Sequence, residues 1–318
     1  MKKHVIITVL MFTMILIASC ATAASSTKIT EHQPYTARGE DDLVFVGDVL
    51  DLSFVSEETA LPSSFPIYVD KYPFGQEGPL FLIDQPLIDL ATENLKRFLQ
   101  ILYDDDDVSQ YTIEPHAMLP ERVVYDTGLT EISSDPSAIK MLTGEYGMAD
   151  VMASGNLLEN TLIQAALAYL HIDNPKIVPV IQYTESGEIY QYQYTIYDNS
   201  GDFFENILNS SFSFVRATHY PDTSDVLLTL RKTDISDLYS NELVIPYEEA
   251  LDYIQDTYGV TEKSNIHAEV YYSNSVEEGY FIPCYKFFIE DSSAPTPNTT
   301  ENVIVYNVVH IPMLLNLD

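Results

Sequence analysis

The sequence is poor in basic residues and cysteine, and it has no tryptophan. Its 318 residues include 15 Lys and Arg against 48 Asp and Glu, with only two cysteines. The net charge of −33 repels phosphate backbones, so nucleic-acid binding is not expected. Two cysteines allow at most one disulfide, so stability has to come from a buried core. The hydrophobic content of 46% is ample for such a core and argues against a disordered chain.

The N-terminus lacks an apolar run long enough to favour a permanent membrane span. Residues 1–4 are basic and residues 5–17 are apolar, which is the layout of a cleaved signal peptide. The following Ile17-Ala18-Ser19-Cys20 resembles a bacterial lipobox, although that motif prefers Leu at its first position. The resemblance implies a signal peptide over residues 1–19, a lipid on Cys20 and an extracytoplasmic location on the cell membrane. Ordinary cleavage after Ala23, with loss of Cys20, is the alternative.

The rest of the sequence predicts an α+β fold. Residues 20–42 are polar and aperiodic, which is typical of a flexible tether between the lipid and the folded body. We expect an N-terminal α+β region over residues 43–155 and a C-terminal α+β domain over residues 156–318. Apolar spacing predicts a helix at residues 87–103, and alternation predicts strands at residues 211–218 and 225–230.

An internal echo in the C-terminal domain predicts two repeat units. Residues 157–197 and 247–290 each show a helical period followed by two strand-like segments. We therefore expect antiparallel sheets with helices packed on one face, and two helix–hairpin repeat units in which each helix crosses its own hairpin. Ala166 and Ala250 should lie at the closest helix–sheet contacts.

This layout resembles known secreted bacterial proteins. The segments Tyr247-Glu248-Glu249-Ala250-Leu251 and 280–287 are similar to the helix and Tyr-rich hairpin of the PepSY-type module. Two such units behind a membrane anchor also resemble the YycH/YycI-type extracytoplasmic regulators of a membrane histidine kinase, which carry a transmembrane helix instead of a lipobox. The resemblance implies a non-enzymatic binding or regulatory role with an envelope protein partner. It assigns no site residue.

Candidate chemical groups are few, and each has a structural alternative. The S-x-x-K at residues 137–140 matches serine β-lactamases, but its companion motifs are misplaced, so an ordinary helix start at Asp135-Pro136 is expected. Cys284 and His310 would be a nucleophile and base if their strands are neighbours, and buried sheet residues otherwise. The four acids of residues 104–107 suit either calcium or a solvated loop.

Tyrosines form the last notable pattern. Tyr190, Tyr192 and Tyr194 alternate along one predicted strand, so they share a face. We expect the helix at residues 157–171 to cover that face, and a sugar- or peptide-binding surface is the alternative.

Taken together, the sequence predicts no catalytic, cofactor-binding or metal-binding residue. It predicts a lipid-anchored extracytoplasmic protein with a non-catalytic binding or regulatory role at the cell envelope. The alternatives are an envelope hydrolase with unidentified carboxylates, and a lipoprotein that binds a small ligand or a cation.

Overall fold

The computed structural model describes residues 35–36, 44–46, 55–56, 59–72, 85–116, 122–183, 188–274, 279–290 and 306–314. The predicted signal peptide and Cys20 lie outside these residues. The described α-helices are α2 (Gln85–Tyr103), α3 (Met148–Ser154), α4 (Thr161–Leu170), α5 (Phe203–Phe212) and α6 (Tyr247–Tyr258). The described strands are β1 (Tyr35–Thr36), β2 (Val44–Val46), β3 (Ser64–Val69), β4 (Glu114–Pro115), β5 (Val123–Asp126), β6 (Thr130–Ser134), β7 (Ala138–Thr143), β8 (Pro175–Tyr183), β9 (Ile189–Asp198), β10 (Ser213–His219), β11 (Val226–Lys232), β12 (Leu238–Leu243), β13 (Ile266–Ser273), β14 (Tyr280–Glu290) and β15 (Tyr306–Pro312).

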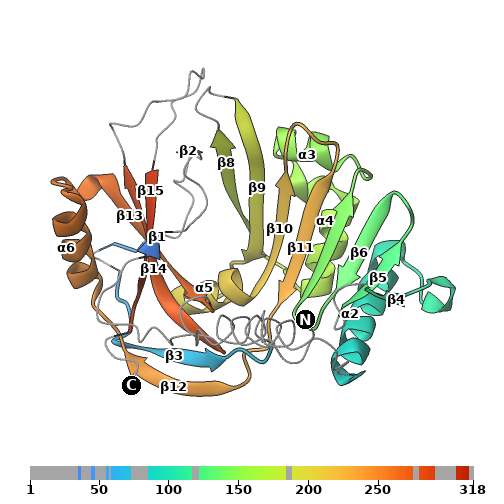
Figure 1. Cartoon of the computed structure of the whole chain (residues 1–318), viewed down its shortest axis with the longest axis horizontal. Coiled ribbons are helices and arrows are strands. Elements are labelled where there is room, and N and C mark those ends of the chain that lie inside the picture. Colours follow the sequence, from blue (N-terminus) through green and yellow to red (C-terminus); the bar gives the residue numbers. More distant parts are fainter. Residues whose placement is uncertain are drawn as a thin grey trace, which may run out of the picture.

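The strands pair antiparallel in the order β12-β3-β14-β15-β2-β8-β9-β10-β11-β7-β6-β5-β4, with β1 beside β15 and β13 beside β14. This sheet bends into two parts whose inner faces oppose each other (Figure 1). We call β7 to β11 the large wall and β13 to β15 the small wall. Strands from the predicted N-terminal region join both parts, because β3 pairs with β12 and β14 while β7 pairs with β11.

The outer face of the large wall is covered by α3 and α4, and α2 packs against α4 and covers the neighbouring strands β5 and β6. Alternation in β10 explains the two faces: Val215 and Ala217 are buried beneath the helices, whereas Phe214 and Arg216 point to the inner face. Helix α4 packs between α2 and the sheet, and Asn160 caps it by accepting hydrogen bonds from the backbone N–H groups of Leu162 and Ile163. The hydrophobic core of the large wall therefore lies on its outer side, and the helices of this core do not cover its inner face.

The small wall is covered on its outer face by α6. Tyr247 of α6 packs against the rings of Tyr285 and Phe287 on β14. The buried Tyr285 hydroxyl donates to the Ile245 carbonyl at 2.9 Å, which ties the start of the helix to the strand. Gly259 ends α6 in the left-handed conformation, as expected of a helix C-cap.

Helix α5 lies at the base of the two parts and contacts β9, β10 and β13 (Figure 1). Its N-terminus carries a capping box, in which Asp202 accepts from the backbone N–H of Glu205 and the Glu205 side chain accepts from the backbone N–H of Asp202. The helix buries Ile207 and Phe212 in the core of the small wall. It therefore joins the two parts and closes the space between them from below.

The predicted fold class was wrong in its repeat units and in placing the helices on one face. Helix α4 packs on α2, β10 and β11 instead of on its own hairpin β8–β9. Seven of its ten residues are buried, so it is an interior helix, whereas α6 buries only Ala250, Leu251 and Ile254. Helices α6 and α2 to α4 lie on the outer faces, and α5 lies between the inner ones. The structure is a sheet-rich mixed α+β fold without two equivalent units.

The helix expected at Asp135-Pro136 is also absent, because this segment is the turn between β6 and β7. The Asp135 side chain accepts hydrogen bonds from the backbone N–H groups of Ser137 and Ala138. An aspartate can cap a turn in the same way as a helix, and here the chain continues as a strand. No helix within the described part of the chain is both long and apolar enough to cross a membrane.

Candidate functional site

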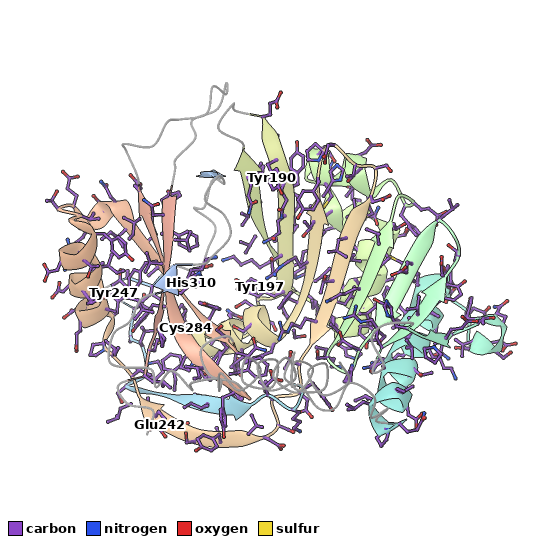
Figure 2. The ribbon with its side chains drawn as sticks, in the orientation of Figure 1. Tyr190, Tyr197, Glu242, Tyr247, Cys284 and His310 are labelled. Carbon is purple, nitrogen blue, oxygen red and sulfur yellow. The ribbon has the colours of Figure 1, made fainter. Side chains whose placement is uncertain are left out.

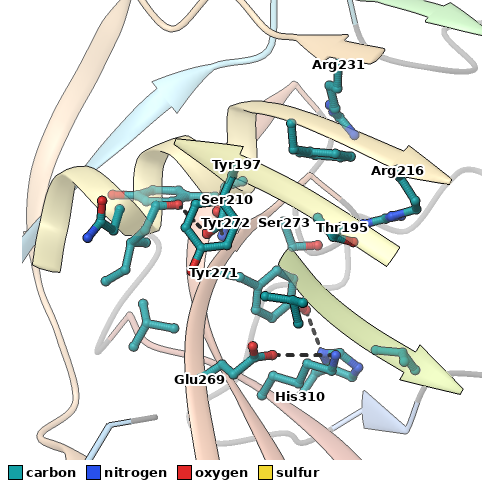
Figure 3. Close-up of a pocket in the computed structure, with 18 of the residues that line it drawn as sticks. Thr195, Tyr197, Ser210, Arg216, Arg231, Glu269, Tyr271, Tyr272, Ser273 and His310 are labelled. Atoms are coloured by element: carbon teal, nitrogen blue, oxygen red, sulfur yellow. Dashed lines mark hydrogen bonds and ion pairs between the residues drawn. The ribbon is translucent and has the colours of Figure 1, made fainter. Parts of the chain in front are cut away.

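A cleft lies between the inner faces of the two walls, with α5 at its base (Figures 2 and 3). It encloses about 400 Å³, which is within the range of small-molecule sites. Hydroxyl, amide and charged side chains converge in it from both walls and from α5, and they alternate with aromatic rings. The lining includes Thr195, Tyr197, Asn206, Ser210, Phe214, Arg216, Arg231, Glu269, Tyr271, Ser273, Lys286, Phe288 and His310.

The strand register of the large wall places two arginines in the cleft. Arg216 on β10 pairs with Thr195 on β9 and with Thr229 on β11, so these three side chains form one row on the inner face. The next row contains Tyr197, Phe214 and Arg231. The two arginines are therefore diagonal neighbours on adjacent strands, and Figure 3 shows both on the same side of the cleft.

Neither arginine forms an ion pair with a carboxylate among the described residues. The Arg216 guanidinium lies 4.9 Å from the centre of the Phe214 ring, and it makes no ion pair with any described residue. Arg231 donates to the Thr233 hydroxyl at 3.0 Å and lies 5.9 Å from the centre of the Phe281 ring. Both positive charges thus remain available on the inner face.

The surroundings of these arginines disfavour their charged form. Arg216 is open to solvent in the cleft, but the walls around it reduce its hydration. This partial burial lowers the pKa of Arg216, and repulsion from Arg231 lowers it further. Burial also lowers the pKa of Arg231, an effect that Asp70 and Asp135 partly offset. Both groups stay protonated at neutral pH because the ordinary pKa of arginine is very high.

The small wall is nearly neutral by comparison. Glu269, Lys286 and His310 form one row across β13, β14 and β15, and the Lys286 ammonium lies 3.6 Å from the Glu269 carboxylate. The Tyr271 hydroxyl and His310 Nδ1 share a hydrogen bond of 2.6 Å. Burial, followed by repulsion from Lys286, lowers the pKa of His310 to about 4, so this ring is neutral at pH 7.

One polar atom at the base of the cleft is unsatisfied. The Asn206 side chain on α5 donates to the Gly201 carbonyl at 3.1 Å. Its buried Oδ1 accepts no hydrogen bond from any described residue. A buried acceptor without a donor is costly, and a bound hydroxyl or amine would satisfy it.

The residues that the sequence singled out do not assemble into a catalytic set. Cys284 and His310 lie on neighbouring strands, but Cys284 opposes Pro312 and His310 opposes Lys286. Cys284 is fully buried, and burial raises the pKa of its thiol well above the usual range, which makes it unreactive. Ser137 lies in the β6–β7 turn, outside the cleft lining.

The predicted acidic loop and tyrosine face have local structural roles. Asp105 and Asp107 accept hydrogen bonds from the backbone N–H groups of Asp107 and Ser109, which closes the turn after α2. No group of three or more potential metal ligands occurs within the described ranges. Tyr194 is buried and donates to the Met152 carbonyl of α3 at 2.9 Å, while Tyr190 is 40% exposed. The tyrosine face is therefore covered in part, with α3 supplying that hydrogen bond.

Arg216 and Arg231 were missed by the sequence reasoning. A signal was present, because Arg216 lies in one predicted strand and Arg231 directly follows the other, both on the side opposite the apolar residues. Alternation alone assigns such residues to solvent. That their face lies opposite a second sheet depends on pairing between distant strands, which local patterns do not encode.

Comparisons with known proteins add little. No protein-family model matches the chain, and no curated protein sequence matches it. Among solved structures, the chain is similar to an uncharacterized protein from Eubacterium rectale. The identity is 8%, the alignment covers 78% of this chain and 83% of that one, and the TM-score is 0.36. A likeness this weak carries no argument about the site, and the lipobox and PepSY-type resemblances stay predictions.

Proposed function

We propose that the chain is a lipid-anchored extracytoplasmic protein that binds a ligand in the cleft between its two walls without transforming it. One observation carries this proposal: polar and aromatic side chains from both walls and from α5 converge on a cleft of about 400 Å³. Such convergence is typical of small-molecule sites. The anchor remains the part supported by sequence alone, through Cys20.

Binding is favoured over hydrolysis by the chemistry of the lining. Glycoside hydrolysis requires two carboxylates that flank the substrate. The described lining contains one, Glu269, which Lys286 already neutralises. A thiol mechanism would need a reactive Cys284, and that thiol is buried with a raised pKa.

Native mass spectrometry of the protein, purified gently from its own membranes, tests the proposal. We expect an excess mass from a retained small molecule that disappears on denaturation. Ser273→Trp should abolish the excess mass by filling the cleft from the small wall. The matched variant Ser264→Trp, on the exposed turn before β13, should retain it. An excess mass that survives Ser273→Trp would place the bound molecule elsewhere and refute the role of the cleft.

A further inference from the structure

We infer that the cleft selects an organic anion, with one oxyanion group held by Arg216 and Arg231 and an apolar body held against the aromatic rings of the large wall. This inference rests on the proposed binding role of the cleft and names the chemical class of its ligand.

The positions of the two arginines are unusual for such an acidic chain. Basic residues are outnumbered by 48 to 15 in the whole chain, yet two of the 15 are diagonal neighbours on this inner face. Neither forms an ion pair with a described residue, although Asp70 and Asp135 attract Arg231 at longer range. Like charges on diagonal positions of adjacent strands repel each other. Nothing in the core of the large wall requires them, because both project away from it. An anion bound between them would remove the repulsion.

Contacts within the protein position both guanidinium groups before a ligand binds. The Arg216 guanidinium lies over the Phe214 ring, and Arg231 lies over the Phe281 ring and donates a hydrogen bond to the Thr233 hydroxyl. A planar guanidinium held in this way presents paired donors that match carboxylate and phosphate oxygens. Thr195 flanks Arg216 in the same row and adds a hydroxyl donor.

An apolar surface beside the arginines suits the body of the ligand. Val178, Tyr197 and Phe214 form a separate buried apolar cluster beside the arginines. All three residues line the cleft, which is much larger than a single inorganic ion, so they offer an apolar surface to the body of a larger ligand. The part of the opposite wall that lines the cleft adds no net charge, because Lys286 pairs with Glu269 and His310 is neutral.

The acidic surface of the protein does not oppose this assignment at contact distance. Exposed charges are screened over about 8 Å at physiological ionic strength, whereas the two arginines act on a ligand in direct contact. The negative surface charge slows the approach of an anion. Once the anion is in the cleft, its direct contacts with the arginines determine the selectivity.

The test uses two fluorescent probes of similar shape, anionic 8-anilinonaphthalene-1-sulfonate and neutral N-phenyl-1-naphthylamine. The wild-type protein should bind the sulfonate more tightly than the neutral probe. Arg216→Gln should weaken sulfonate binding by about tenfold or more, the factor expected for one charged hydrogen-bonding group, and leave the neutral probe unchanged. Arg97→Gln, an exposed arginine on α2, is the matched control and should change neither.

The outcomes separate this inference from the proposed function. If both probes bind and Ser273→Trp blocks them, but Arg216→Gln affects neither, the anion assignment is overturned and the binding cleft stands. If neither probe binds, or both still bind after Ser273→Trp, both proposals are contradicted. Displacement of the sulfonate by phenyl phosphate or by benzoate then shows which oxyanion the arginines prefer, and failure of both to compete overturns the assignment.

Discussion

At the scale of single residues, the two arginines differ from the ion-paired cations Arg122 and Lys71. Arg122 forms an ion pair with Asp135 at 3.4 Å, and Lys71 pairs with Asp234 at 2.7 Å. Arg216 has an aromatic contact and a like-charged neighbour instead. A charged side chain beside a like charge is unfavourable for stability. Such a side chain is expected where it serves binding instead of stability.

Arg216→Gln should therefore leave stability unchanged or raise it slightly. The substitution removes a repulsion together with the weak contact to the Phe214 ring, and it removes no ion pair. Because the first two effects offset each other, we expect the free energy of unfolding to change by less than about 0.5 kcal/mol, or to increase. Urea unfolding at pH 7 measures this. Arg122→Gln is the contrasting variant, since it removes the ion pair of the half-buried Asp135, and it should cost on the order of 1–3 kcal/mol. A similar loss for Arg216→Gln would assign it a structural role.

His310 should make the protein sensitive to mild acid. Its pKa is about 4 in the folded state and near 6.5 when unfolded, so between these values the unfolded state binds the extra proton. Stability is therefore lost as the pH falls through this window. From pH 7 to pH 5, the wild type should lose on the order of 2 kcal/mol more than His310→Gln, measured by urea unfolding at each pH. Equal losses in both proteins would contradict the burial of this ring.

At the scale of elements, the sequence patterns correctly predicted the helices and strands that form from interactions within a single segment. The helix expected at residues 87–103 is α2, and the strands expected at residues 211–218 and 225–230 are β10 and β11. Each follows from apolar periodicity within a single segment. The turn at Asp135 was mispredicted because the same side-chain hydrogen bonds begin turns and helices. The two-repeat prediction failed because the surface on which each helix packs depends on strands that are distant in the sequence.

Helix α4 offers a direct test of its interior position. Ala166 is fully buried, whereas Ala168 on the same helix is exposed. Ala166→Leu should overpack the contact of α4 with its neighbours and cost about 1–3 kcal/mol. The control Ala168→Leu should change stability by less than about 0.5 kcal/mol. Thermal unfolding followed by circular dichroism compares the two. Equal effects would mean that α4 is not enclosed as described.

At the scale of the whole molecule, the cleft is a product of topology. Arg216 and His310 line the same cleft from opposite walls only because the sheet bends back on itself (Figure 3). Sequence patterns specify the faces of each strand but not which faces oppose one another. For this reason the alternation of β10 was visible in the sequence and its function was not.

The proposed anchor predicts where the protein is found. A multiply acylated Cys20 would hold the chain on the membrane, since each buried methylene contributes about 0.8 kcal/mol. Cys20→Ala should release the protein from the membrane fraction or block its processing, as measured by fractionation and immunoblotting. Unchanged membrane retention, with cleavage after Ala23, would refute the lipobox.

Hydrogen–deuterium exchange with saturating 8-anilinonaphthalene-1-sulfonate tests the central claim, that one ligand contacts both walls of the cleft. Exchange should slow together in β10 (Ser213–His219) and β13 (Ile266–Ser273), which line opposite sides. It should not change in α2 (Gln85–Tyr103), which lies on the outer face of the sheet. Slowing restricted to one wall, or centred on α2, would contradict a ligand held between the two walls.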